Sequence, residues 1–220
     1  MAWPALSDLR GRLRSILNES TAAFWTDAEL NRYINDGERD VAAKSECIQS
    51  VSALSTALYA TMYRQVLFSG YKVLFVENTS ATIPVGLQKI TPKQMGRKSY
   101  TSGAPQYWFP WGQYIIIDPL PTASYNLNVY TANYPTYEMS ADTDTPQIPS
   151  ECIECIFPYA AYRALWKSKK WGQSALYYSE YIAMVQQKKS LFDMFTIDNK
   201  PTITQPEVVE YVSGGGQQNV

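Results

Sequence analysis

A helix start in residues 24–36 constrains the fold more than any other stretch of the chain. Thr26 has the character of an N-cap, and Glu29, three residues later, completes a capping box in which each side chain accepts a backbone N–H. Apolar residues then recur at helical spacing, so we expect a helix with one apolar face that runs to about Lys44. The residues on that face are Leu30, Tyr33, Ile34, Gly37 and Val41.

The spacing of apolar residues changes twice along the chain. A first helix, capped by Ser7, is expected to pair with the Thr26 helix as a hairpin. From residue 51 to 145, short segments rich in β-branched and aromatic residues alternate with turn residues, which predicts strands. The part from 51 to 68 fits both a helix and a strand, and we favour a strand pair. Helical spacing returns after Ser150, although Pro158 would remove a hydrogen bond inside that helix.

The predicted fold class is α+β, a helical bundle with an inserted β-domain and an extended C-terminal tail. We expect N-terminal helices in residues 1–50, the inserted β-domain in 51–145, C-terminal helices that complete the bundle in 146–195, and the tail in 196–220. Two prolines and three consecutive glycines disfavour a regular helix in the tail. The tail is nevertheless apolar, and residues 208–212 have the composition of a strand added to another chain. We expect it to bind a partner, and the alternative is a disordered end. Its candidate binding residues are Ile203, Pro206, Val208, Val209, Tyr211 and Val212.

Composition argues against several kinds of chemistry. The chain has no histidine, which removes Ser-His-Asp and Cys-His catalysis and His-ligated metals. Cys152 and Cys155 have the spacing of a redox or zinc half-site, but zinc would need two further ligands, and the sequence has neither histidine nor a second such pair. We interpret these two and Cys47 as reduced, structural cysteines. The prediction is a protein that is not an enzyme, with no catalytic residue, metal or cofactor.

The number of aromatic residues points to surfaces. The chain has 17 Tyr and 6 Trp, residues that are favoured where apolar area is buried while one edge stays wet, as at protein interfaces. The alternative is an aromatic-rich core. A net charge of −1 gives no reason to expect broad affinity for nucleic acid. Apolar runs are too short for a membrane span, and the N-terminus lacks the pattern of a signal peptide, so we expect synthesis in the cytoplasm.

Three sets of segments, in this order, resemble the head-to-tail adaptor proteins of tailed bacteriophages, also called head-completion or connector proteins. The first is 24–30 with 34–39, the second is 103–105 with 115–121 and 125–130, and the third is 144–149 with 159–161 and 175–181. The resemblance extends over residues 5–195. The chain departs from it at 51–68 and at Pro158.

The resemblance implies a structural virion protein that forms a ring of twelve copies beneath the portal ring and extends the DNA channel. Its implied partners are further copies of itself, the portal protein and a tail or nozzle protein, while packaged DNA passes without sequence-specific contact at genome ejection. The implied location is the head–tail junction of the virion, without a membrane, after synthesis in the host cytoplasm. Basic side chains could line the channel, and the alternative is a solvated helix face. The candidates are Lys167, Lys169, Lys170, Lys188 and Lys189.

Two other classes of protein compete with this interpretation. The aromatic run at 107–111 is typical of surfaces that stack on sugar rings, which suggests a carbohydrate- or ligand-binding β module of a virion. Asp142 and Asp144 supply the two carboxylates that glycoside hydrolysis requires. A solvated loop is the commoner setting for such a pair.

Overall fold

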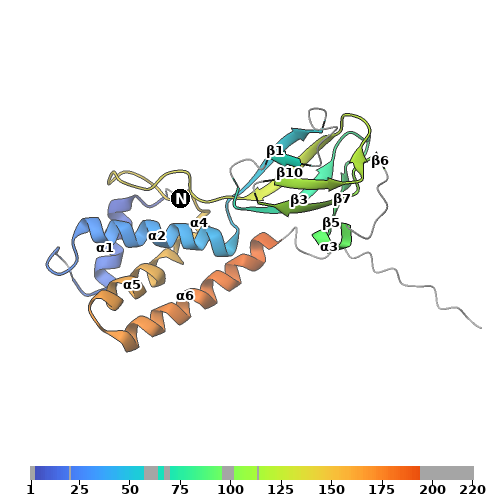
Figure 1. Ribbon diagram of the computed structural model, residues 1–220. Helices are drawn as coiled ribbons and strands as arrows, with labels where there is room; N and C mark the ends of the chain where they lie inside the picture. Colours follow the sequence, from blue (N-terminus) through green and yellow to red (C-terminus); the bar gives the residue numbers. More distant parts are fainter. Residues whose placement is uncertain are drawn as a thin grey trace, which may run out of the picture.

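The computed structural model describes residues 3–19, 21–56, 64–66, 70–95, 102–112 and 114–193. Figure 1 shows the long helices, from both ends of the chain, on one side of the molecule and the strands on the other. Within the described ranges, none of the helices has the length and apolar character that crossing a membrane requires. The helices are α1 (Leu6–Ile16), α2 (Asp27–Ser45), α3 (Pro92–Met95), α4 (Ser150–Ile153), α5 (Ile156–Lys167) and α6 (Trp171–Phe192).

The predicted capping box at the start of α2 is confirmed. The Thr26 hydroxyl accepts the Glu29 N–H at 3.2 Å, and the Glu29 carboxylate accepts the Thr26 N–H at 3.1 Å. Each bond satisfies a donor that the first turn of a helix leaves without an intrahelical partner. The helix ends at Glu46, whose backbone takes a left-handed conformation with φ of 57°.

The predicted cap of the first helix is wrong. Ser7 lies inside α1, and the N-cap residue is Ala5. A distant loop satisfies the first turn instead, because the Asp144 carbonyl accepts the Leu6 N–H at 2.8 Å and the Asp142 carbonyl accepts the Ser7 N–H at 3.2 Å. Backbone contacts over a long sequence separation are not visible in a local sequence pattern.

Helices α2 and α5 pack closely where Gly37 of α2 leaves room for side chains of α5. A Cβ atom at Gly37 of α2 would lie only 3.1 Å from Tyr159 Cδ1 and 3.3 Å from Ile156 Cγ2. The apolar face of α2 meets a stripe of small side chains on α5 that are fully buried in the same core. These residues are Ala160, Ala161 and Ala164.

Pro158 causes no break in α5. The preceding helix, α4, ends at Ile153, and α5 begins at Ile156, so Pro158 falls within the first turn. The N–H groups of a first turn have no intrahelical acceptor, and a proline there therefore costs no hydrogen bond.

The described strands form three sheets. The first has the order β1-β10-β3-β4, the second β2-β8-β7-β5, and the third pairs β6 with β9. In the first sheet the strands are β1 (Gln49–Ser55), β10 (Asn126–Ala132), β3 (Lys72–Asn78) and β4 (Val85–Gly86). In the others they are β2 (Arg64–Val66), β8 (Tyr114–Asp118), β7 (Tyr107–Trp111), β5 (Gln88–Lys89), β6 (Ser102–Gly103) and β9 (Leu120–Pro121).

The first two sheets bury a core of their own, separate from the core of the helices. Alternate residues of β1, β3 and β10 point inward and meet inward residues of β7 and β8. Trp108 is almost fully buried there, and its indole N–H donates to the Leu87 carbonyl at 3.2 Å. The other members are Leu54, Val73, Val76, Leu87, Ile115, Ile117, Leu127 and Val129.

The described parts of segment 51–68 are strands, as favoured, but they do not pair with each other. β1 pairs with β10 over its whole length, and β2 pairs with β8 in the other sheet. The two strands therefore belong to different layers, which a local pattern could not show. Residues 57–63 and 67–68 lie outside the described ranges.

The predicted fold class is wrong. With roughly 43% of the described residues in helices and 23% in strands, the protein is a mixed α+β fold with several sheets and not a helical bundle that carries an insertion. The physical reason is that the strands bury an apolar core of their own and do not merely decorate a helical one. The predicted tail, residues 196–220, lies outside the described residues, and the predicted domain boundaries stay a prediction.

One acidic side chain connects the helices to the first sheet. The buried Glu46 carboxylate binds Lys72 Nζ of β3 at 2.6 Å and Lys189 Nζ of α6 at 3.5 Å. Nearby, the Gln49 side chain at the start of β1 donates to the Phe192 carbonyl at 3.1 Å. The C-terminal end of α6 is therefore held beside the first residue of β1.

Candidate interaction surface

Aromatic side chains of α5 and α6 stack into one continuous array, which we call the aromatic ladder. On each helix they follow helical spacing, so that they emerge on neighbouring faces and meet across the helix pair. The ladder consists of Tyr159, Tyr162, Trp166, Trp171, Tyr178 and Tyr181.

The rings of the ladder contact one another at short distances. The ring centroids of Trp166 and Trp171 lie 4.5 Å apart at an interplanar angle of 78°. The Tyr162 and Tyr178 centroids are 5.0 Å apart. Such edge and tilted arrangements are the favoured geometries of aromatic pairs.

The ladder runs from the core to the surface. Tyr181 is fully buried, whereas Tyr178, Trp171 and Trp166 are 42%, 51% and 57% exposed. A contiguous group of large exposed rings is uncommon on a monomeric protein and marks an interaction site. Tyr and Trp are also the residues that most often anchor protein interfaces.

Phe24, in the loop between α1 and α2, is a further exposed ring that is connected to α5 through Lys167. It is about half exposed, and the Lys167 ammonium, next to Trp166, lies 5.0 Å from its ring centroid. Trp25 beside it is buried and donates its indole N–H to the Ala164 carbonyl at 3.2 Å. One aromatic residue thus anchors the loop between α1 and α2, while its neighbour is presented to solvent.

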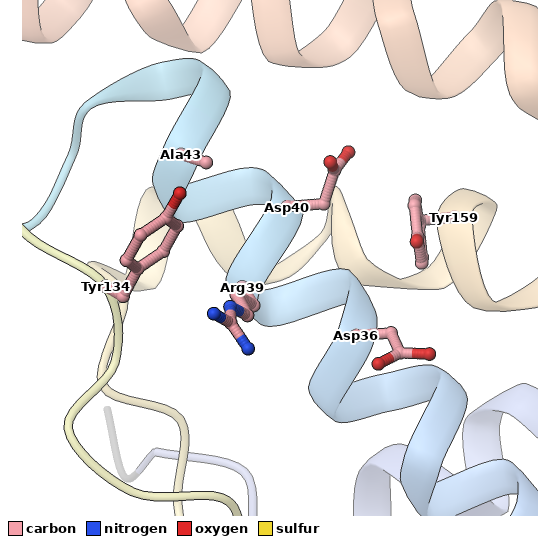
Figure 2. A pocket seen from close by; sticks show the side chains of 6 residues that line it. All are labelled: Asp36, Arg39, Asp40, Ala43, Tyr134 and Tyr159. Carbon is pink, nitrogen blue, oxygen red and sulfur yellow. The ribbon is translucent and has the colours of Figure 1, made fainter. Parts of the chain in front are cut away.

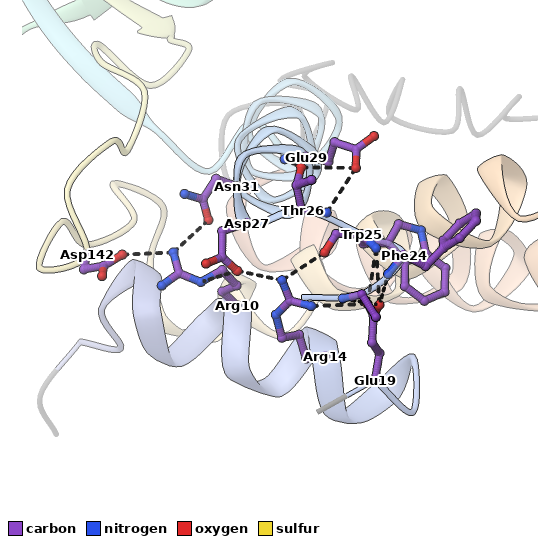
Figure 3. Close-up of polar contacts among 11 residues, drawn as sticks. Arg10, Arg14, Glu19, Phe24, Trp25, Thr26, Asp27, Glu29, Asn31 and Asp142 are labelled. Atoms are coloured by element: carbon purple, nitrogen blue, oxygen red, sulfur yellow. Dashed lines mark hydrogen bonds and ion pairs between the residues drawn. The ribbon is translucent and has the colours of Figure 1, made fainter. Parts of the chain in front are cut away.

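A buried ion-pair network holds this loop in place (Figure 3). The Glu19 carboxylate accepts the backbone N–H groups of Phe24 and Trp25. The Arg14 guanidinium binds Glu19 at 3.2 Å, Asp27 at 2.6 Å and the Trp25 carbonyl at 3.0 Å. Arg14 therefore joins α1, the loop and the start of α2, and fixes the position of Phe24.

The Arg14 network predicts a loss of stability in acid. The hydrogen bond from Arg14, together with the nearby Arg10, lowers the pKa of Asp27. A lowered pKa means that the stabilisation is present above the unfolded-state pKa and is lost as pH falls through the folded-state pKa. We expect the free energy of unfolding to fall between about pH 5 and pH 3, and to fall less steeply in Asp27→Asn. Urea unfolding at several pH values measures both slopes.

Glu38 provides a control of opposite sign. Burial raises the pKa of this carboxyl, although the backbone N–H groups of Gln147 and Ile148 donate to it. Its stabilising contribution is therefore present below the unfolded-state pKa and is lost as pH rises through the folded-state pKa. Glu38→Gln should make the acid-induced loss steeper, and equal slopes in both variants would contradict the assignment.

A shallow hollow lies beside the buried end of the ladder, between α2, α5 and the loop after β10 (Figure 2). Its volume is about 320 Å³. The Arg39 guanidinium lies 4.9 Å from the Tyr134 ring centroid on one side. Asp40 accepts hydrogen bonds from Tyr181 and Lys44 on the other. The remaining lining residues are Asp36, Ala43 and Tyr159.

Burial raises the pKa of Tyr159, which lines this hollow, and of Tyr181, which lies next to it. Besides burial, the hydrogen bond to Asp40 raises the pKa of Tyr181, and the charge of Asp40 raises the pKa of Tyr159. A phenol kept neutral beside an engaged carboxylate is suited to hydrogen bonding and not to nucleophilic attack.

The five lysines predicted to face a channel separate into two groups. Lys167, Lys169 and Lys170 lie together where α5 turns into α6, and Lys167 binds Glu29 at 2.6 Å. Lys188 and Lys189 lie near the other end of α6, about 27 Å away at 1.5 Å per residue. Their role at a channel stays a prediction.

The predicted tail residues, Ile203 to Val212, lie outside the described residues. All three cysteines are buried and free of disulfides. Across the described ranges, no group of three or more side chains of the metal-binding types is placed to hold a metal ion.

The two carboxylates considered for glycoside hydrolysis both have structural partners. Asp142 binds Arg10 at 2.9 Å. Asp144 accepts the backbone N–H groups of Ser140 and Ala141, both at 2.8 Å, and these bonds lower its pKa. A general acid needs a raised pKa, so this pair is better explained as a turn that holds its own backbone.

The aromatic run at 107–111 does not form a flat platform for sugars. Trp108 and Phe109 are buried, and Trp111, which is 53% exposed, lies at the end of the β7–β8 hairpin. Two of the aromatic residues thus belong to the cores of the sheets, which was the alternative to sugar stacking.

These features define a class of protein. In the described part of the chain the candidate surface is an exposed aromatic array next to a loop held by the Arg14 ion pairs, an arrangement typical of proteins that bind other proteins. The chain belongs to the SU10 adaptor protein family, whose family model matches residues 4–202. This confirms the resemblance to phage adaptors and gives the chain a structural role in a virion. A comparison with curated proteins found no match.

Proposed function

We propose that this protein forms a ring of identical subunits, twelve by resemblance, that joins the capsid portal to the tail and extends the DNA channel at the head–tail junction. Portal protein and a tail or nozzle protein are its partners on the two faces of the ring. The role is structural, and no catalytic step is involved.

The exposed end of the aromatic ladder carries this proposal. Phe24, Trp166, Trp171 and Tyr178 together expose more aromatic surface than an isolated chain needs. A ring requires each subunit to present two different surfaces, one for each neighbour. We assign the exposed end of the ladder to one of these surfaces.

Trp171→Ser is expected to weaken self-association of the purified protein by at least tenfold, because about 1.4 kcal/mol is tenfold and a large anchor ring commonly contributes more than that. Sedimentation velocity over a range of concentrations measures the effect. Trp111→Ser is a matched control, because Trp111 is equally exposed but lies on a hairpin of the sheets. We expect it to leave self-association unchanged.

A second measurement tests the role in the particle. Portal-bearing heads mixed with the wild-type chain should acquire rings visible by electron microscopy, and heads mixed with Trp171→Ser should acquire few. Equal self-association and equal ring formation by the two tryptophan variants would refute the assignment of the ladder.

A further inference from the structure

We propose that the outer edge of β1 accepts the C-terminal tail of a neighbouring copy as an added strand, with residues 208–212 as the inserted segment. This inference rests on the proposed ring, because it needs a second copy within reach. It assigns the partner that the sequence predicts for the tail to another copy of the same chain.

The outer edge of β1 presents backbone N–H and C=O groups with which an added strand can pair. β1 is the last strand of its sheet within the described residues, with β10 on its inner side. The Ile48 carbonyl and the Thr56 N–H, just outside the two ends of β1, both form hydrogen bonds with residues just outside the ends of β10. Bonding alternates along an antiparallel strand, so the N–H and C=O groups of Val51 and Ala53 point to the outer edge. An extended segment could pair with these groups.

The side chains at this edge favour an apolar segment. Val51 lies opposite Tyr130 of β10, and Tyr130 lies opposite Phe75 of β3, so the three form a row across the sheet. The Phe75 and Tyr130 ring centroids are 5.7 Å apart, whereas Val51 is 54% exposed. The row thus ends in an exposed apolar side chain, beside which an added strand would place its own side chain.

The tail has the composition that this edge requires. Residues 208–212 read Val-Val-Glu-Tyr-Val, and Val209 and Tyr211 would share one face of an extended strand. With that face toward Val51, the apolar row would continue into the added strand. Pro201 and Pro206 precede the segment and favour an extended backbone.

The connecting segment is long enough for the tail to reach a neighbouring copy. The described chain ends at residue 193, beside Gln49 at the start of β1. Residues 194–207 span up to about 46 Å before Val208 is reached, at about 3.3 Å per residue. β1 itself is only about 23 Å long. This reach is about twice the length of β1, so the tail is long enough to leave its own subunit and pair with the β1 of the next one.

Two full-length variants test the pairing from its two sides. Val51→Pro removes an outward N–H while keeping those that face β10, and proline is tolerated in edge strands. Val209→Asp combined with Tyr211→Asp places charge in the inserted segment. Each variant alone should self-associate at least tenfold more weakly than the wild type in sedimentation velocity. In the tail variant, the amides of Val51 and Ala53 should exchange hydrogen at least tenfold faster.

Mixing the two variants shows whether the contact is made between copies. The mixture pairs an intact tail with an intact β1 edge, so part of the association should return. If the mixture stays as weak as its components, the tail pairs with its own chain and the inference is wrong. The inference would also be wrong if both variants self-associated, and exchanged amide hydrogens, as the wild type does. If circular dichroism shows that Val51→Pro is unfolded, the experiment uses Val51→Lys in its place. A failure here, with the effect of Trp171→Ser intact, leaves the ring itself supported.

Discussion

Replacing Arg14 by methionine is expected to lower the free energy of unfolding by about 1–3 kcal/mol, the range for leaving a buried hydrogen-bonding group without its partner. Methionine retains much of the apolar stem but removes the guanidinium. The partly buried Glu19 carboxylate then loses its cation, and the buried Trp25 carbonyl loses its donor. Equilibrium urea unfolding followed by circular dichroism measures the change.

Arg12→Met is the matched control on the same helix. Arg12 binds Glu154 through two hydrogen bonds of 3.0 and 2.8 Å, which is good geometry. Both side chains are more than half exposed, however, and exposed pairs contribute about 0–1 kcal/mol. Equal costs for the two arginine variants would show that burial of the Arg14 network does not stabilise the fold.

Gly37→Leu should destabilise the protein by about 3 kcal/mol, at the upper end of the range for overpacked cores. The first added carbon would already lie 3.1 Å from Tyr159 and 3.3 Å from Ile156. The three further carbons of leucine must then enter the contact between α2 and α5, and the helices would have to separate.

The same substitution at Gly11 in α1 should have the opposite sign. A Cβ atom there meets no atom within 4 Å, and Gly11 is exposed. Leucine has a higher helix propensity than glycine, so we expect stabilisation of about 0.5–1 kcal/mol. Thermal unfolding of both variants gives the comparison, and a stabilised Gly37→Leu would contradict the close packing of these helices.

Local features were predictable from sequence, and long-range ones were not. The Thr26 capping box and the apolar face of α2 depend on residues a few positions apart, and both are as predicted. The replacement of a Ser7 cap by the carbonyls of Asp142 and Asp144 depends on residues more than 130 positions away. The assignment of β1 and β2 to different sheets is likewise a matter of tertiary pairing.

The sequence predicted that aromatic residues would lie at a surface, but it did not show where the surrounding chain would place that surface. The number of Tyr and Trp residues predicted an aromatic interface, and the spacing on the last helices is visible in the sequence. Arg14 and Arg12 both belong to α1, yet Arg14 is buried and Arg12 is exposed. Two arginines that differ by two positions look alike in sequence, and only the course of the following loop decides which one is enclosed.

The contacts of Glu46 have a mechanical consequence. Glu46, the left-handed residue at the end of α2, lies in the short connection between the helices and the first strand of the sheets. Its carboxylate forms ion pairs with Lys72 of β3 and Lys189 of α6. The Gln49 side chain of β1 donates a hydrogen bond to the end of α6 close by. Helices α2 and α6 and the first sheet are therefore joined at one place, and we expect the connection to be stiff. A load applied to the sheets is thus transmitted to the helices with little bending at this connection.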